Sequence, residues 1–448
     1  MFQKVLIANR GEIAVRIIQA CRDLGIISVA VYSEADREAL HAQIADEAVC
    51  IGPARAADSY LNMDNIISAA IAAGCQAIHP GFGFLSENPD FAERTTQAGL
   101  AFIGPTAATI RLMGDKSEAK RNAIAAGVPV ALGTDGPLRD FDEAISEAER
   151  IGYPVMLKAA SGGGGKGIRV ALSVKDLKDA YDSASAEAIA NFGDGRLYME
   201  KYIHNPRHIE VQILGDSLGN VVHLFERECS VQRRHQKLIE ECPSAFVTPE
   251  LREKMTSAAV ALAKRVGYRS AGTIEFLVDK DRNFYFCEMN TRIQVEHPVT
   301  EQVTGVDLVC EQLRIAAGEP ISFKQEALVM RGHAIECRIN AEDPSRGFAP
   351  CPGTLVSLHL PGGPGVRVDS AAYQGYKIPP FYDSMIGKLI VYGSDRTQAI
   401  DRMRRALAET LFEGVVTGTD YQMHILCSKA FVDAEFNVNS IENGDFDR

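Results

Sequence analysis

The segment Glu288-Met-Asn-Thr-Arg-Ile-Gln-Val-Glu-His-Pro298 alternates between two kinds of side chain. Its even positions carry glutamate, asparagine, arginine, glutamine and glutamate, whereas its odd positions are mostly apolar. Successive side chains of a strand point to opposite faces, so one face would carry the polar groups of a candidate active site. A fully extended strand would separate Glu288 from Glu296 by about 26 Å, too far for one small-molecule site. We therefore expect the chain to bend between Asn290 and Gln294.

The residues before this segment predict a β-hairpin. Thr273–Val278 and Phe284–Glu288 read as strands joined by a charged turn. The aromatic residues of the second strand are more typical of a core than of a solvated edge strand. A register that places Glu275 opposite Glu288 would set two carboxylates together, which requires a cation between them. With Asn290, this all-oxygen set suits Mg²⁺ or Mn²⁺ held partly by nucleotide phosphates, and not zinc.

The first hundred residues alternate strand and helix signals, which predicts a parallel α/β sheet. The expected strands are Val5–Ala8, Ser28–Tyr32, Ala77–His79 and Ala101–Gly104. The turn after the first strand offers one glycine, Gly11, where dinucleotide binding requires G-x-G-x-x-G, so nicotinamide binding is disfavoured. Ligands of such sheets bind at the carboxyl ends of the strands. The loop Pro80–Phe84 follows one of these ends.

A glycine-rich loop, Ser161-Gly-Gly-Gly-Gly-Lys-Gly167, lies between two apolar runs that read as strands. Glycine permits close backbone approach, and consecutive N–H groups can hold phosphate oxygens. Lys158 and Lys166 add positive charge on either side. The loop lacks the ending of a Walker A motif. Because flexible linkers seldom join two strands, a hinged phosphate flap is the favoured interpretation over a linker.

Two further segments carry polar groups that suit a ligand. The strand predicted over His208–Ile213 places its histidine beside a glutamate and a glutamine on one face, so a structural role and a ligand contact stay equally open. Cys229–Lys237 is densely basic in an acidic protein. We expect an anion, or acidic neighbours such as Glu240 and Glu241, to neutralise it, although a solvated loop is an alternative.

Composition excludes several classes of protein. The chain has 448 residues, of which 46% are hydrophobic, and its formal net charge is −12. This charge argues against a general nucleic-acid binder but leaves room for local anion pockets. The ten cysteines are scattered with no C-x-x-C pair, so neither a zinc cage nor a disulfide framework is predicted and a reducing cytoplasm is expected. We expect no export signal and no membrane span, because no apolar run approaches about 18 residues.

The last part of the chain, from Arg331, predicts an α+β unit. His333–Ile339 and Lys388–Tyr392 read as strands, and proline–glycine turns lie between them. Apolar residues from Ile400 to Leu411 recur on one face of a predicted helix.

Motifs along the whole chain resemble those of biotin carboxylase, the ATP-grasp subunit of acetyl-CoA carboxylase and related biotin-dependent carboxylases. The motifs are Asn9–Ala14, His79–Glu87, Gly114–Lys116, the glycine-rich loop, Gln232–Lys237, Glu288–Pro298, Arg338–Asp343 and Tyr382–Ile386. The resemblance implies an N-terminal Rossmann-like parallel-sheet domain over 1–113. An ATP-grasp domain would follow over 114–330, with a mobile glycine-rich lid at about 130–203, and then a C-terminal α+β domain over 331–448.

The resemblance also implies an activity, the ATP-dependent carboxylation of biotin on a biotin carboxyl carrier protein. Bicarbonate would attack the γ-phosphate to give carboxyphosphate, and the CO₂ released from it would be captured by the ureido nitrogen of biotin. The implied cofactors are ATP and a pair of Mg²⁺ or Mn²⁺ ions. The reaction would serve acetyl-CoA carboxylase in fatty acid synthesis. Alternatives are a component of a pyruvate or propionyl-CoA carboxylase, another ATP-grasp carboxylate–amine ligase, or a non-catalytic nucleotide-binding scaffold.

Roles for individual residues follow from the same resemblance. Residues expected to bind ATP are Lys116, Lys158, Gly164, Gly165, Glu200, Lys201, Tyr202, Ile203, His208, His235, Glu275 and Glu288. Residues expected to hold the metal ions are Glu275, Glu288 and Asn290. Residues expected to bind bicarbonate are Lys237, Arg292, Gln294 and Val295. Residues expected to act in catalysis are Lys237, Arg292, Arg338 and the base Glu296, with Arg338 and Phe82 at biotin. Arg292 should lower the pKa of Glu296 and keep it ionised.

The resemblance predicts partners as well. The chain contains no Met-Lys-Met biotinylation motif and no length for a carboxyltransferase, so carrier and carboxyltransferase are expected on separate chains. A cytoplasmic homodimer without nucleic acid or membrane is expected. Three positions depart from the family pattern: Phe82 stands where a tyrosine is frequent, and Gln19 and Pro364 replace an arginine and an aromatic residue near the dimer contact.

Overall fold

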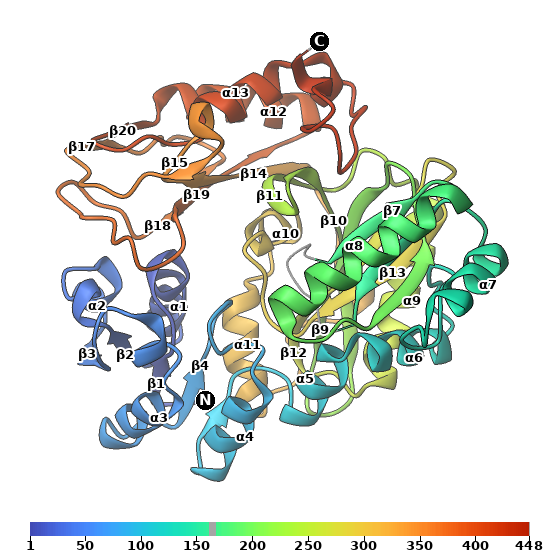
Figure 1. Cartoon of the computed structure of the whole chain (residues 1–448). Helices are drawn as coiled ribbons and strands as arrows, with labels where there is room; N and C mark the ends of the chain where they lie inside the picture. The colour runs from blue at the N-terminus through green and yellow to red at the C-terminus, as the bar shows by residue number, and fades with distance from the viewer. Residues whose placement is uncertain (161–166, 448) are drawn as a thin grey trace.

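The computed structural model describes residues 1–160 and 167–447. The predicted phosphate flap, including Gly164, Gly165 and Lys166, therefore lies outside the described residues. Figure 1 shows the N-terminal elements in blue at the lower left, the central elements in green and yellow at the right, and the C-terminal helices in red across the top.

The N-terminal part is a parallel five-stranded sheet with the order β3-β2-β1-β4-β5, which confirms the predicted β-α-β series. Its strands are β1 (Lys4–Ile7), β2 (Ile27–Tyr32), β3 (Glu47–Cys50), β4 (Ala77–His79) and β5 (Ala101–Phe102). Its helices are α1 (Gly11–Asp23), α2 (Leu40–Ile44), α3 (Met63–Ala72), α4 (Pro89–Gln97) and α5 (Ala107–Gly114). Helix α1 is buried on nearly all sides, because one face covers the sheet and another packs against strand β18 of the C-terminal part.

Acid should destabilise this N-terminal part through two buried histidines. Burial lowers the pKa of His41 to about 4 and that of His79 to about 3, so both are neutral in the folded chain. Unfolded histidine titrates near pH 6.5, so stability is full above about pH 6.5 and falls as the pH drops toward 4. At about pH 5 we expect each histidine to cost about 2 kcal/mol, measured by urea unfolding against neutral pH. His41→Gln should remove its share of the pH dependence, and equal stability at both pH values would contradict the prediction.

A small antiparallel sheet with the order β7-β6-β8 and two helices form a separate layer. Its elements are α7 (Phe141–Ile151), β6 (Val155–Ala159), β7 (Ile168–Ala171), α8 (Val174–Phe192) and β8 (Leu197–Lys201). Val155, Leu157 and Met199 are buried beneath α7 and α8 and form its own core. The elements of this layer lie between residues 141 and 201, within the range of about 130–203 that was predicted to form the lid.

The largest sheet has eight strands in the order β13-β12-β9-β10-β11-β14-β19-β18. Its strands are β9 (Arg207–Gly215), β10 (Val221–Arg233), β11 (Gln236–Cys242), β12 (Ser270–Val278), β13 (Phe284–Asn290), β14 (His333–Asn340), β18 (Val366–Ser370) and β19 (Met385–Gly393). The sheet runs without interruption across the domain boundary expected at residue 330, because β11 pairs with β14. Residues from both sides of that boundary therefore belong to one continuous sheet.

The remaining elements cover the faces of these sheets. The central helices are α6 (Lys116–Ala125), α9 (Pro249–Arg265), α10 (His297–Thr304) and α11 (Leu308–Ala316). The C-terminal elements are β15 (Glu342–Asp343), β16 (Ala349–Pro350), β17 (Ser357–His359), α12 (Arg396–Glu409), β20 (Leu411–Glu413), α13 (Thr419–Cys427) and α14 (Lys429–Val432). The helix predicted to include Leu411 ends at Glu409, and Leu411 instead starts β20, which pairs with β17.

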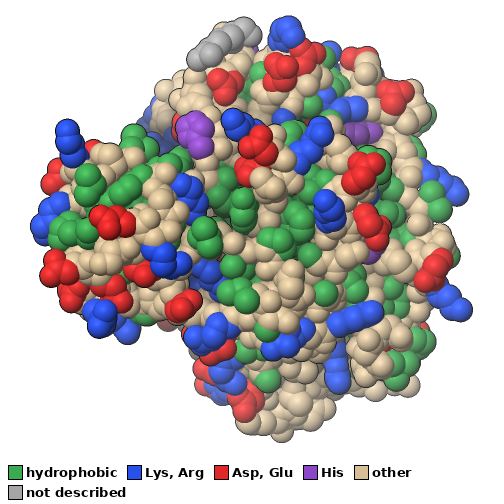
Figure 2. Space-filling view, turned by 90° about the vertical axis from the view of Figure 1, so that its right-hand side faces the viewer, with side chains coloured by type: hydrophobic (Ala, Val, Ile, Leu, Met, Phe, Trp, Pro, Cys, Tyr) green, Lys and Arg blue, Asp and Glu red, His purple; other side chains and the backbone are tan. Residues whose placement is uncertain are grey.

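The surface does not gather charge of one sign on the face that Figure 2 shows. Lysine and arginine side chains lie interspersed with aspartate and glutamate on this face, with apolar side chains between them. Among the described residues, none of the helices is both long and apolar enough to span a lipid bilayer.

Candidate functional site

The polar segment 288–298 bends as predicted. Strand β13 ends at Asn290 and helix α10 begins at His297, so the alternation of faces stops at Asn290. One detail of the prediction is wrong, because β13 is an edge strand of the large sheet. The edge is not solvated, since the Phe286 N–H donates to the Pro129 carbonyl and the Phe286 side chain is buried. The loop between the two elements turns its polar side chains back toward the sheet.

The predicted hairpin register is confirmed at the residues that matter for the site. Glu275 on β12 lies directly opposite Glu288 on β13. Beyond this pair the register shifts by one residue, because Cys287 is an extra residue that forms a β-bulge. The bulge exposes both Cys287 and Glu288 to the same cavity.

A cavity of about 1290 Å³ lies where the three parts of the chain meet. Every predicted site residue within the described part of the chain lines it. These residues are Phe82, Lys116, Lys158, Glu200, Lys201, Tyr202, Ile203, His208, His235, Lys237, Glu275, Glu288, Asn290, Arg292, Gln294, Val295, Glu296 and Arg338. The predicted residues thus come together, although they belong to distant segments of the sequence.

Lys237 is the electrostatic centre of the cavity floor. Its ammonium lies 2.7 Å from Glu210, 3.1 Å from Glu275 and 2.6 Å from Glu296. Burial alone would raise the pKa of Glu296, but Lys237 and Arg338 lower it below its usual value. A lowered pKa was predicted from Arg292. Arg292 does interact electrostatically with Glu296, but its side chain donates to Glu87 and Asn290, and Lys237 and Arg338 are the stronger causes.

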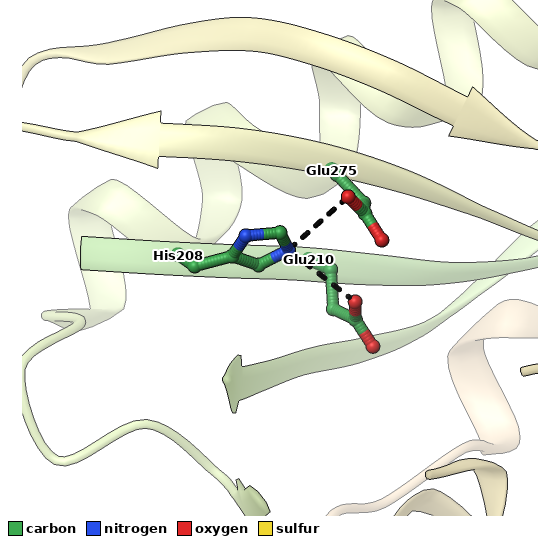
Figure 3. Close-up of side chains that lie close together, drawn as sticks. All are labelled: His208, Glu210 and Glu275. Atoms are coloured by element: carbon green, nitrogen blue, oxygen red, sulfur yellow. Dashed lines mark ion pairs between the residues drawn. The ribbon is translucent and has the colours of Figure 1, made fainter. Parts of the chain in front are cut away.

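His208 closes this network on β9, as Figure 3 shows. Its Nε2 lies 3.3 Å from Glu275 and 3.7 Å from Glu210. Burial favours the neutral ring, but Glu275 and Glu210 raise the pKa of His208 to about 9. Lys237 lies within ion-pair distance of both carboxylates, so in this structure the three residues take part in an ion-pair network around one ammonium.

Arg338 on β14 joins the base to a second buried carboxylate. Its Nε donates to Glu240 at 2.6 Å and its Nη2 donates to Glu296 at 2.8 Å. This corrects the prediction that Glu240 and Glu241 neutralise the basic segment before them, because Glu241 pairs with His333 and Arg396. Of the basic side chains within that described segment, only Lys237 forms ion pairs with the floor carboxylates.

The predicted nucleotide-binding lysines line the same cavity. Lys158 on β6 lies 2.5 Å from Glu200, which β8 places beside it. Lys120, a residue that was not predicted, reaches the same carboxylate at 3.3 Å. Two ammonium groups around one carboxylate leave positive charge in excess, which suits phosphate. Lys120 follows Lys116 by one helical turn on α6, and this spacing is the sequence signal that was missed.

Arg227 is a second residue that sequence reasoning missed. It is fully buried in β10, and its guanidinium donates to Glu210, Gln212, Thr273, Gln294 and Thr300 at 2.5–3.1 Å. This single side chain thereby fixes the Gln294 amide, predicted to bind bicarbonate, to three strands of the sheet. The signal available in the sequence was a lone arginine flanked by two glutamates, Glu226 and Glu228, which reads equally well as a solvated face.

The predicted metal ligands fit a hard divalent cation in part. Glu275 and Glu288 face each other across paired strands, and burial together with Glu275 raises the pKa of Glu288. A divalent cation between the two carboxylates would neutralise this excess of negative charge. Asn290 is less available, because its amide nitrogen donates to Glu275 at 2.9 Å and its oxygen accepts from Arg292 at 3.0 Å.

Models of known families match three consecutive segments of the chain. The descriptions are "Biotin carboxylase, N-terminal domain" for residues 1–110, "Carbamoyl-phosphate synthase L chain, ATP binding domain" for residues 115–324, and "Biotin carboxylase C-terminal domain" for residues 336–443. With the fold and the charged cavity, these matches define an ATP-dependent enzyme of the ATP-grasp class.

Full-length relatives narrow the class to one family. Biotin carboxylase 1 of Bacillus subtilis is 55% identical, with 99% of each chain covered. A pyruvate carboxylase subunit of Methanothermobacter thermautotrophicus is 54% identical, with 99% of this chain and 90% of the relative covered. A crystal structure of Campylobacter jejuni biotin carboxylase with an ATP-type ligand has a TM-score of 0.95 at 49% identity, with 99% of each chain covered. The chain belongs to the biotin carboxylase family.

Proposed function

We propose that this chain carboxylates biotin on a biotin carboxyl carrier protein, using bicarbonate and ATP. The observation that carries the proposal is the convergence of Lys237, Glu296 and Arg338 with the lysines Lys116 and Lys158 in one cavity. This arrangement supplies cations for the phosphates, a carboxylate base, and a second cation beside that base. These are the groups that phosphoryl transfer to a small oxyanion requires.

Bicarbonate binds between Arg292, the Gln294 side chain, the Val295 backbone and Lys237. The planar fork of an arginine matches a planar oxyanion. Glu296 is ionised at neutral pH, because Lys237 and Arg338 oppose the effect of burial, and it accepts the bicarbonate proton. The freed oxygen then bonds to the γ-phosphorus as the bond to the β-phosphate oxygen breaks. ADP leaves and carboxyphosphate remains.

Carboxyphosphate breaks down to CO₂ and phosphate. The ureido N–H of biotin gives its proton to this phosphate, and the nitrogen then bonds to the carbon of CO₂. Arg338 stabilises the negative charge that develops on the ureido oxygen. Phe82 borders the same end of the cavity and offers a ring without a hydroxyl, so it contributes contact and not a hydrogen bond.

The residues that bind ATP are Lys116, Lys158, Glu200 to Ile203, His208 and His235. Glu275 and Glu288 would hold Mg²⁺ or Mn²⁺, with Asn290 as a further ligand once its contacts rearrange. When bound, these ions neutralise phosphate charge and help to align the γ-phosphate. A structure of the Hydrogenobacter thermophilus 2-oxoglutarate carboxylase biotin carboxylase domain, 52% identical, is described as a dimer with MgADP, ADP and bicarbonate, and this supports the assignment.

The surrounding assembly belongs to the same proposal. We place the carrier protein and the carboxyltransferase on separate chains, and we expect a cytoplasmic homodimer. The first candidate for the complete reaction is acetyl-CoA carboxylation to malonyl-CoA. Pyruvate carboxylation is the second candidate, since the archaeal relative named for pyruvate carboxylase is 54% identical.

The test is ADP release by the purified protein with MgATP, with and without bicarbonate and free biotin. We expect biotin to raise ADP release only when bicarbonate is present. Arg338→Ala should lower the biotin-dependent rate by about a hundredfold, whereas Arg405→Ala on the exposed face of α12 should not. ATP turnover that ignores bicarbonate would instead favour a carboxylate–amine ligase.

A further inference from the structure

Lys388 on β19 is a fully buried lysine behind the wall of the cavity. It does not line the cavity, yet its ammonium donates to the Val295 carbonyl at 2.9 Å. β19 also places it directly opposite Arg338 on β14. Lys388 therefore touches the loop that carries the bicarbonate ligands and lies beside the biotin residue, without access to either substrate.

The other neighbours of Lys388 come from three more segments. Its ammonium lies 3.2 Å from Glu12 on α1 and 3.9 Å from Asp369 on β18. It also lies 6.0 Å from the centre of the Phe82 ring. The Val295 carbonyl is thus the nearest of these partners. Glu12 and Phe82 line the cavity, whereas Asp369 lies on β18 and is not among the lining residues.

Charge neutralisation alone does not account for this lysine. Asp369 already has a bidentate partner, because Arg367 donates to both of its oxygens at 2.7 Å. Burial raises the pKa of Glu12 to about 7 even beside Lys388, and burial also raises the pKa of nearby Glu336 well above its usual value. Together these carboxylates still keep Lys388 charged, since they raise its pKa above its usual value despite burial. Charge balance alone does not require the direct hydrogen bond that the ammonium donates to the Val295 carbonyl.

We propose that Lys388 is a positioning residue that fixes the Val295 peptide, and through it the bicarbonate-binding loop 291–296, against the large sheet. The proposal rests on the function proposed above, in which the Val295 backbone binds bicarbonate. The Val295 carbonyl and the Glu296 N–H belong to one planar amide, so this hydrogen bond orients the peptide that joins the bicarbonate ligand Val295 to the base Glu296. Loss of the hydrogen bond should therefore weaken bicarbonate binding and leave ATP binding intact.

The test compares Lys388→Met with the double variant Lys388→Met/Glu12→Gln. Methionine has a similar shape but donates no hydrogen bond, and the glutamine removes the negative charge of Glu12, the carboxylate that lies 3.2 Å from the lost ammonium. Bicarbonate-dependent ADP release should show a KM for bicarbonate raised about ten- to a hundredfold in both variants, with the KM for ATP unchanged. Lys429→Met, at an exposed lysine on α14, is the matched control.

The double variant separates positioning from a merely structural role. If it regains the wild-type KM for bicarbonate, the lysine serves only to balance Glu12 and the proposal is overturned. The same holds if both variants fold, as judged by thermal unfolding, with the wild-type KM. If Lys388→Met does not fold, the double variant is compared with the wild type instead. If the double variant also fails to fold, Lys388 is required for the stability of the core and the proposal is overturned. A wild-type protein that ignores bicarbonate would refute the proposed function itself, which is a distinct result.

Discussion

Replacing Glu296 with glutamine is expected to lower bicarbonate-dependent ADP release by about a hundred- to ten-thousandfold. The carboxylate is buried between Lys237 at 2.6 Å and Arg338 at 2.8 Å, and these cations keep it ionised. Glutamine has nearly the same shape but cannot accept a proton. Its amide nitrogen would also face two cations that need an acceptor. Steady-state rates at saturating ATP and bicarbonate measure the effect.

The matched control for this change is Glu240→Gln. Glu240 accepts from the same guanidinium, at 2.6 Å from the Arg338 Nε, but makes no contact with Lys237 among the described hydrogen bonds. Burial raises its pKa to about 7, so its loss removes less charge than the loss of Glu296. We expect a much smaller decrease in rate. Equal losses in the two variants would mean that the carboxylates act by orienting Arg338, and that Glu296 is not the base.

Removing the guanidinium of Arg227 should have the largest effect on stability. Arg227→Met is expected to lower the free energy of unfolding by about 3–5 kcal/mol, because it leaves buried partners of a charged group unpaired. Those partners include Glu210, Gln294 and Thr300. Urea unfolding with and without MgATP measures the change, and bicarbonate-dependent activity should fall with it.

Two further variants separate the causes of that loss. Arg227→Lys keeps the positive charge but loses the planar fork, so it should recover only part of the stability. Arg405→Met removes an exposed arginine that pairs with Glu409 one turn along α12, and it should change stability by less than about 1 kcal/mol. A loss at Arg227 as small as the loss at Arg405 would show that the sheet tolerates the unpaired groups.

The predictions from the sequence were most accurate where they depended on local patterns. The register of Glu275 against Glu288 follows from a single hairpin, so period-two alternation and the turn between the strands were sufficient to predict it. The bulge at Cys287 was not predictable, because apolar and polar residues do not alternate strictly in this segment and an interruption of the alternation leaves no visible mark in its sequence. Helix α12 was predicted in type but not in length, since the apolar spacing that includes Leu411 continues past the last helical residue.

Pairings between distant segments were beyond the reach of the sequence. Lys237 was predicted from its motif, but its three carboxylate partners lie on β9, on β12 and before α10. Arg227 was missed because an isolated arginine in an alternating strand is more frequently solvated than buried. Glu240 and Glu241 were assigned to the basic residues nearest in sequence, whereas the antiparallel pairing with β14 presents them to cations almost a hundred residues away.

Because β11 pairs with β14, the protein cannot be divided into stable fragments between these two strands. A fragment that stops between the second and third family segments would end with β11 as an open edge, its backbone N–H and C=O groups deprived of β14. Such an edge recruits any available strand, so the fragment should aggregate and not persist as a free nucleotide-binding module. Two separately expressed halves should therefore restore activity only if they associate during folding. A reporter domain inserted between residues 324 and 336 would interrupt one continuous sheet.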